Sequence, residues 1–171
     1  MKPISLNDIN IRTTLQPGDI GYVIYLHGAL YEQEYSYGIS FEVYVAEGLA
    51  EFYHQYDAGK DRVWIAEHEG RIVGFLLLMH RGDAAQLRYF IIAPAYRGIG
   101  LGKKMMELFM DCLKEYGYTS AYLWTTSELP TAASLYRRHG FTLTEEKPSA
   151  ASFGKPVTEQ RYDLVFTPLH L

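Results

Sequence analysis

The sequence has few of the features that mark secreted, disulfide-bonded or membrane proteins. Its 171 residues include a single cysteine, Cys112, so no internal disulfide can form and a reducing compartment is expected. The longest apolar run, residues 75–79, is much too short to cross a membrane. The first residues lack the long apolar stretch of a signal peptide. We therefore expect a cytoplasmic protein with no membrane partner.

The chain also lacks an excess of charge of one sign. Sixteen Lys and Arg stand against 20 Asp and Glu, which gives a net charge of −4 with neutral histidines. Domains that bind nucleic acid usually carry a basic surface, so we expect no nucleic-acid partner. Nothing in the sequence points to a metal site, and Cys112 falls on the apolar face of a predicted helix, where it packs. The length and the 48% apolar content predict one domain over residues 1–171.

Hydrophobic periodicity predicts alternating strands and helices. The pattern favours strands at residues 4–11, 63–67, 72–79, 86–93, 119–125, 141–145 and 158–166. It favours helices at residues 19–31, from residue 40, from residue 98 or 99 to 117, and at 130–138. The second helix is predicted to bury Val43, Ala46, Leu49, Ala50 and Tyr53, and residues 147–156 to form a loop. This order predicts a mixed sheet with helices on both faces.

The most informative stretch is Arg97-Gly98-Ile99-Gly100-Leu101-Gly102, followed by Lys103 and Lys104. Its three glycines let the backbone approach a ligand closely, and a helix starting there directs free N–H groups at that ligand. The stretch fits no P-loop, because Arg97 stands at the first glycine, and no dinucleotide fingerprint, because Lys103 stands at the third. It predicts a site for an anionic group such as a pyrophosphate. A simple connecting turn remains the alternative.

These residues resemble the R-x-x-G-x-G/A signature of the GCN5-related N-acetyltransferases (GNAT family), whose loop holds the pyrophosphate of acetyl-coenzyme A (acetyl-CoA). Residues 87–94 are similar to the family's fourth strand, which typically ends in a proline. Residues 133–141, ASLYRRHGF, resemble the family's A-x-x-L-Y-x-x-x-G-F segment. The resemblance implies an α/β (α+β) fold. It implies a GNAT-like mixed, mostly antiparallel central sheet of about six to seven strands with helices on both faces.

A narrower resemblance covers the N-terminal part. Residues 15–21 and 27–31 resemble acetyltransferase domains fused to MarR-type DNA-binding regulators. No winged-helix pattern precedes them in this sequence, so regulation by DNA binding is not expected. One position departs from the wider family: many members carry a cofactor-binding Asn after the fifth strand, where this sequence reads Thr125-Thr126-Ser127. Hydroxyl groups would have to replace the amide there.

The resemblance implies that the protein moves an acetyl group from acetyl-CoA directly to a primary amine in a ternary complex. The acceptor would be a small molecule or a lysine-like side chain, and the family's tyrosine that protonates the departing thiolate corresponds to Tyr136. The residues implied for cofactor binding are Phe90, Ile91, Ile92, Arg97, Gly98, Ile99, Gly100, Leu101, Gly102, Lys103, Ser127 and Tyr136.

The acceptor side is less defined by the sequence. Glu32 and Glu34 precede a tyrosine-rich segment and are candidate bases or amine-binding carboxylates, with His27 and Glu42 as weaker candidates. Two other functions stay open: a non-catalytic coenzyme A-binding sensor or interaction module, and a nucleotide-binding domain of another kind. A monomer and a homodimer are both compatible with the sequence.

Overall fold

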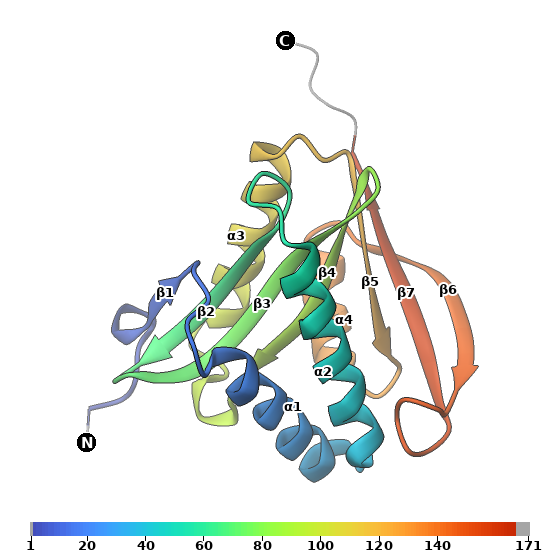
Figure 1. Ribbon diagram of the computed structural model, residues 1–171, viewed down its shortest axis with the longest axis horizontal. Coiled ribbons are helices and arrows are strands. Elements are labelled where there is room, and N and C mark those ends of the chain that lie inside the picture. Colours follow the sequence, from blue (N-terminus) through green and yellow to red (C-terminus); the bar gives the residue numbers. More distant parts are fainter. Residues whose placement is uncertain (1, 167–171) are drawn as a thin grey trace.

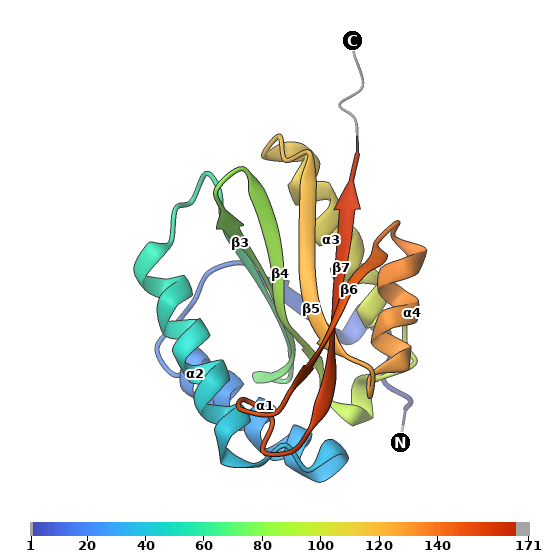
Figure 2. The same cartoon turned by 90° about the vertical axis from the view of Figure 1, so that its right-hand side faces the viewer.

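One seven-stranded sheet organises the computed structural model, which describes residues 2–166 (Figures 1 and 2). The strands lie in the order β1-β2-β3-β4-β5-β7-β6. They are β1 (Asn10–Arg12), β2 (Arg62–His68), β3 (Arg71–Arg81), β4 (Ala84–Ile92), β5 (Ser120–Thr126), β6 (Thr142–Ser149) and β7 (Val157–Val165). The helices are α1 (Asp19–Tyr35), α2 (Gly38–Gln55), α3 (Leu101–Glu115) and α4 (Pro130–Arg138).

All neighbouring strands pair antiparallel except β4 and β5, which pair parallel. A parallel pair needs a crossover connection, and α3 supplies it between these two strands. The expected mixed, mostly antiparallel sheet with helices on both faces is therefore confirmed.

Two apolar cores lie on opposite faces of the sheet, with α1 and α2 on one face and α3 and α4 on the other (Figures 1 and 2). Strand β3 contributes to both: Leu76 and Leu78 pack in the core of α3, while Phe75 and Leu77 pack in the core of α1 and α2. Successive strand residues point to opposite faces, so an all-apolar strand belongs in the middle of a covered sheet. Strand β3 is accordingly buried on both faces along most of its length.

The predicted buried face of the second helix is wrong except for Leu49, which is 1% exposed and packs in the core. Val43 and Tyr53 are 48% and 63% exposed, whereas the residues of α2 that face the core include Phe41, Val45 and Phe52. Apolar residues lie on more than one face of α2, so periodicity alone could not choose between the faces. The large aromatic rings bury more apolar area than the alternatives, and they decide the orientation.

Several element boundaries also differ from the predictions. In the predicted first strand, residues 6–8 form a short 3-10 helix, because Asp8 accepts hydrogen bonds from the backbone and hydroxyl of Ser5. Helix α1 continues to Tyr35, and α3 begins at Leu101. Strand β6 runs to Ser149, into the predicted loop, because it pairs there with β7.

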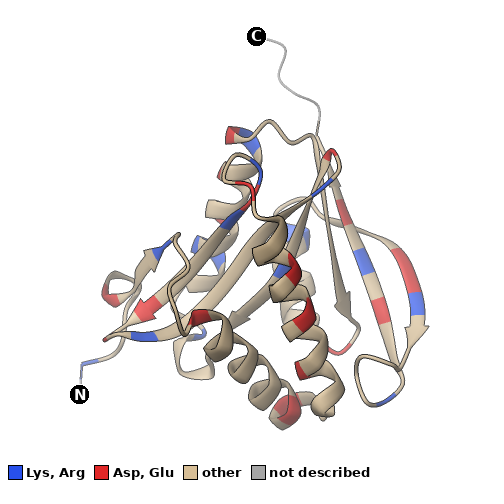
Figure 3. Ribbon diagram, viewed as in Figure 1, with Lys and Arg blue, Asp and Glu red and all other residues tan. Residues whose placement is uncertain are grey.

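Charge is distributed unevenly over the helices. In Figure 3, acidic positions lie along α1 and α2, and neither helix contains a lysine or arginine. Three of these carboxylates, Asp19, Glu34 and Glu51, pair with arginines that other segments of the chain supply. Within residues 2–166 no helix is long and apolar enough to span a bilayer.

Candidate active site

The glycine-rich loop forms the N-terminal end of α3. Gly98 and Gly100 have φ angles of +79° and +91°, a region that side chains with a Cβ rarely adopt. Gly100 is the N-cap of α3, and its carbonyl accepts the first helical hydrogen bond from Lys104 at 3.0 Å. The first N–H groups of the helix have no partner within it, so they and the helix dipole are directed at the space in front of the loop.

Strands β4 and β5 separate beside this loop. They pair only at Ala85 with Ala121 and at Gln86 with Tyr122, and beyond these pairs β4 has no neighbour on that edge. Strand β4 also carries an irregularity in its pairing with β3, and Tyr89 there has a φ of +57°. A bulge re-aims the backbone and side chains that follow it. The later half of β4 thus offers free backbone groups to a cleft in the middle of the sheet.

The larger of two cavities lies between this edge, the loop and α4. Its volume is about 440 Å³. It is lined by eight of the predicted cofactor residues: Phe90, Ile91, Ile92, Arg97, Gly98, Gly100, Gly102 and Lys103. Arg138 of α4 adds a further cation to its wall.

Three predicted cofactor residues do not line either cavity. Leu101 is 1% exposed and packs in the core below the loop, and Ile99 packs against the same core. Ser127 follows β5 and donates its backbone N–H to Thr158 at 3.0 Å, away from both cavities. Thr126, which precedes it, lines the smaller cavity instead and shares a 2.7 Å hydrogen bond with Tyr37.

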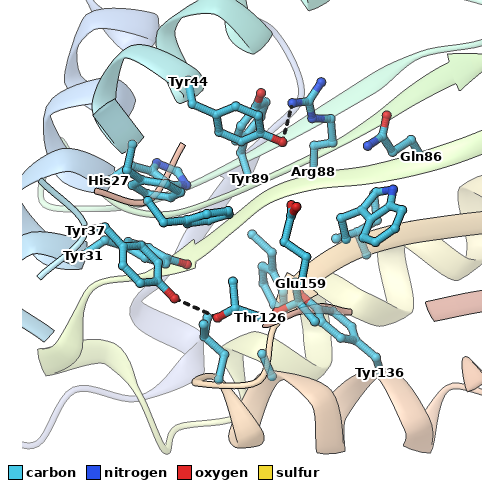
Figure 4. A pocket seen from close by; sticks show the side chains of 18 residues that line it. His27, Tyr31, Tyr37, Tyr44, Gln86, Arg88, Tyr89, Thr126, Tyr136 and Glu159 are labelled. Atoms are coloured by element: carbon cyan, nitrogen blue, oxygen red, sulfur yellow. Dashed lines mark hydrogen bonds between the residues drawn. The ribbon is translucent and has the colours of Figure 1, made fainter. Parts of the chain in front are cut away.

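The smaller cavity has a volume of about 110 Å³, and Figure 4 shows the side chains around it. Four residues line both cavities: Tyr31, Phe90, Leu129 and Ala132. The other walls are mainly aromatic and come from α1, α2, β4, β5, α4, β7 and the β6–β7 loop. The two cavities therefore lie next to one another and share part of their walls.

Tyr136 of α4 lines the smaller cavity, close to the point where the two cavities meet. Its side chain is 5% exposed and packs against Phe90, Phe141 and Tyr162. Burial raises the pKa of its phenol well above the usual value, because the charged phenolate is poorly solvated there. The hydroxyl is thus protonated at neutral pH.

His27 of α1 lies in another wall of the smaller cavity and is buried. Its Nδ1 lies 2.8 Å from the carbonyl oxygen of Val23, which accepts the N–H, and Nε2 has no hydrogen-bond partner. Burial lowers the pKa of the ring to about 4. His27 is therefore neutral at physiological pH. The other weak candidate, Glu42, packs beside Gly28 between α1 and α2 and lines neither cavity.

The two acidic residues predicted for the acceptor side lie elsewhere. Glu32 accepts a 2.7 Å hydrogen bond from the backbone of Gly38, which fixes the turn between α1 and α2, and it lines neither cavity. Glu34 lines the larger cavity, where it forms a 2.8 Å ion pair with Arg97. Neither carboxylate faces the smaller cavity.

The charged residues that do line the smaller cavity were missed from the sequence. They are Arg88 of β4 and Glu159 of β7. A usable signal existed for Arg88, since it is the charged residue in the otherwise apolar run of residues 87–93. Glu159 lies in a strand with several charged residues, and nothing local distinguishes it. Within residues 2–166 no group of three or more His, Cys, Asp or Glu side chains could hold a metal ion.

Comparisons with known proteins agree with this architecture. Residues 59–143 match the family model described as an acetyltransferase (GNAT) domain. Over 97 residues the chain is 35% identical to the uncharacterized N-acetyltransferase YjgM of Escherichia coli K12, a match that covers 54% of this chain and 58% of that protein.

Two solved structures share the fold. An acetyltransferase from Streptococcus agalactiae superposes with a TM-score of 0.74 at 20% identity, over 94% of this chain and 100% of that one. The acetyltransferase yncA from Salmonella typhimurium, solved with acetyl-CoA, gives 0.71 at 20% identity, over 96% and 98%. The chain thus has the fold of the GNAT acetyltransferases, and its residues 59–143 are similar to a GNAT acetyltransferase domain. Because the chain spans 58% of the length of YjgM, the activity of the protein is a proposal.

Proposed function

We propose that the protein transfers the acetyl group of acetyl-CoA to the amine of a small molecule or of a lysine-like side chain. The observation that carries this proposal is the pair of adjacent cavities, which share four lining residues. One cavity ends at a glycine-rich helix N-terminus suited to phosphates, and the other is small, aromatic and lined by a buried tyrosine hydroxyl. Two substrates that enter from opposite ends would meet where Tyr136 lies.

The residues of the larger cavity fit acetyl-CoA. At Gly98 and Gly100 the backbone adopts angles that glycine tolerates, which leaves N–H groups uncovered for pyrophosphate oxygens. Lys103 and Arg138 supply positive charge on the same wall. The free edge of β4 at Phe90–Ile92 offers backbone groups to the amides of the pantetheine arm, as a sheet edge does to an added strand. When bound, acetyl-CoA supplies the thioester that reacts.

In the reaction, an N–C bond forms to the acceptor amine and the C–S bond of the thioester breaks. The amine loses one proton, and the sulfur gains one. We assign donation of the latter to the Tyr136 hydroxyl, which is protonated at neutral pH. Its phenolate is poorly solvated, so it regains a proton at once, and the proton released by the amine balances the cycle. A free backbone N–H of β4 would stabilise the charge that develops on the carbonyl oxygen.

Two measurements test the proposal. Acetyl-CoA should raise the unfolding midpoint, whereas ATP and NAD should not, because a ligand that binds only the folded state stabilises it by mass action. Free thiol should then appear when amines are added. Stabilisation without thiol release from any amine would favour the coenzyme A-binding sensor, and stabilisation by ATP or NAD instead would favour another nucleotide-binding function.

We also propose a cytoplasmic enzyme that acts as a monomer or homodimer without nucleic acid or membrane partners. We further infer, from residues 15–21 and 27–31, that the chain is similar to the acetyltransferase domains found fused to MarR-type regulators. Light scattering and a DNA mobility-shift assay with the purified chain test the oligomeric state and the lack of DNA binding.

A further inference from the structure

A guanidinium group and a carboxylate line the smaller cavity without pairing with one another. Arg88 projects from β4 and Glu159 from β7. Figure 4 shows Glu159 directed into the cavity toward the wall that Tyr44, Tyr89 and Arg88 form. The ion pairs of both residues are with other partners. One small space therefore contains one group of each sign.

The charge of Arg88 is only partly compensated. Its side chain is 10% exposed, and its ion-pair partner, Glu51, lies 3.7 Å away. The Glu51 carboxylate is bound more closely by both terminal nitrogens of Arg81, so two guanidinium groups share one carboxylate. The other contacts of Arg88 are the Tyr44 hydroxyl at 3.2 Å and the faces of the Tyr44 and Tyr89 rings. A buried charge without a full counter-ion favours the binding of an anion.

Glu159 is similarly open to a cation. Its side chain is 16% exposed, and the ammonium of Lys147 lies 3.9 Å away. Lys147 is itself half exposed and lies over the Trp124 ring at 4.4 Å. Because solvent screens such a pair, it contributes little, and the Glu159 carboxylate can accept hydrogen bonds from a bound ammonium.

The rest of the cavity limits the size and polarity of what enters. The volume of about 110 Å³ corresponds to roughly four water molecules. Its remaining walls include Tyr37, Phe41, Trp124 and Phe153, which favour an apolar group between the two charged ends.

We propose that the acceptor is a small amino acid, with its carboxylate held by Arg88 and its amine held near Glu159. This rests on the proposed acetyltransferase function, whose acceptor class it narrows. The carboxylate of the amino acid would add to the weak pair of Arg88 with Glu51, and its ammonium would add to the weak pair of Glu159 with Lys147. A plain amine would leave Arg88 without its anion.

Calorimetry of the coenzyme A-saturated protein tests the proposal without turnover. L-alanine and L-alaninamide form a matched pair, since the amide keeps the amine and the methyl group and loses the negative charge. L-phenylalanine with its amide, and β-alanine, extend the comparison to a larger side chain and to a longer separation of charges. At least one amino acid should bind ten times more tightly than its amide. Equal binding of all acids and their amides would overturn the proposal.

Variants locate the effect at Arg88. Arg88→Met should weaken binding of the preferred amino acid by roughly 10- to 100-fold and leave its amide unchanged, because a hydrogen bond to a charged group is lost. Arg62→Met is the control, since Arg62 also contacts a tyrosine ring, a tyrosine hydroxyl and a glutamate but lines neither cavity. Arg88→Lys keeps the charge and should restore part of the affinity.

The outcomes separate this inference from the function on which it rests. An equal loss for acid and amide in Arg88→Met, or the same loss in Arg62→Met, would overturn the role of Arg88. If plain amines release thiol as fast as amino acids, the proposed activity stands and the amino-acid acceptor is wrong. If amino acids bind selectively but no amine releases thiol, the acetyltransferase function is wrong while the binding assignment holds.

Discussion

The pH dependence of stability tests whether His27 is buried and neutral in the wall of the smaller cavity. Its ring is 2% exposed and lies against the rings of Tyr31, Phe41 and Tyr89. No carboxylate contacts it, and the loss of solvation lowers the pKa of His27 to about 4. The unfolded chain should protonate the same residue near the ordinary value of 6.5.

This difference in pKa makes stability depend on pH in one direction. Between pH 6.5 and pH 4 the unfolded state binds more protons at His27 than the folded state does, so acid favours unfolding there. Above pH 6.5 both states are neutral and the effect is absent. From pH 7 to pH 5 the free energy of unfolding should fall by about 2 kcal/mol through this one group.

Urea unfolding of the wild type and of His27→Gln at pH 7 and pH 5 measures the effect. The other titrating groups contribute equally in both proteins. From pH 7 to pH 5 the free energy of unfolding of the wild type should therefore fall by about 2 kcal/mol more than that of the variant. The exposed His54→Gln variant is the control and should behave like the wild type. If His27→Gln shows the same pH dependence as the wild type, the histidine is not held neutral in the wall and the reasoning fails.

Three further predictions concern single substitutions. Gly100→Ala should weaken acetyl-CoA binding in calorimetry, because a Cβ is strained at a φ of +91°; Gly82→Ala, also at positive φ but in a distant turn, should affect only thermal stability. Tyr136→Phe should lower kcat for thiol release at least tenfold with little change in cofactor affinity, and equal rates would remove the hydroxyl from the mechanism. Gly154→Ala should lower the free energy of unfolding by about 2 kcal/mol, because its Cβ would lie 2.8 Å from the Tyr37 carbonyl oxygen at positive φ; unchanged stability in urea would contradict that geometry.

Much of the fold follows from local pattern and was predictable for that reason. A few consecutive residues are enough to predict the strand β3, which is apolar on both faces, and the glycine-rich loop before α3. The sequence places glycines at positions 98 and 100, and the backbone there has the positive φ angles that glycine adopts readily. The order of strands and helices sufficed for the fold class, because a parallel pair requires a crossover and an apolar strand requires cover on both faces.

Other features were not predictable from local pattern. The buried face of α2 was misassigned, because apolar residues on more than one of its faces compete and packing against α1 and β3 decides among them. Glu34 was expected to serve the acceptor, but the fold places it beside Arg97, 63 positions along the chain. Such a pairing joins two segments whose separation in sequence says nothing of their distance in space.

Runs of neighbouring residues were sufficient to predict the architecture and the glycine-rich loop at the start of α3. The tertiary structure alone decided which charges reach the smaller cavity. Arg88 and Glu159 come from strands separated by β5, and they line one space because β4 and β5 diverge after Gln86 and the bulge at Tyr89 re-aims β4. Strand divergence is a property of the assembled sheet, and no single segment of the chain encodes it.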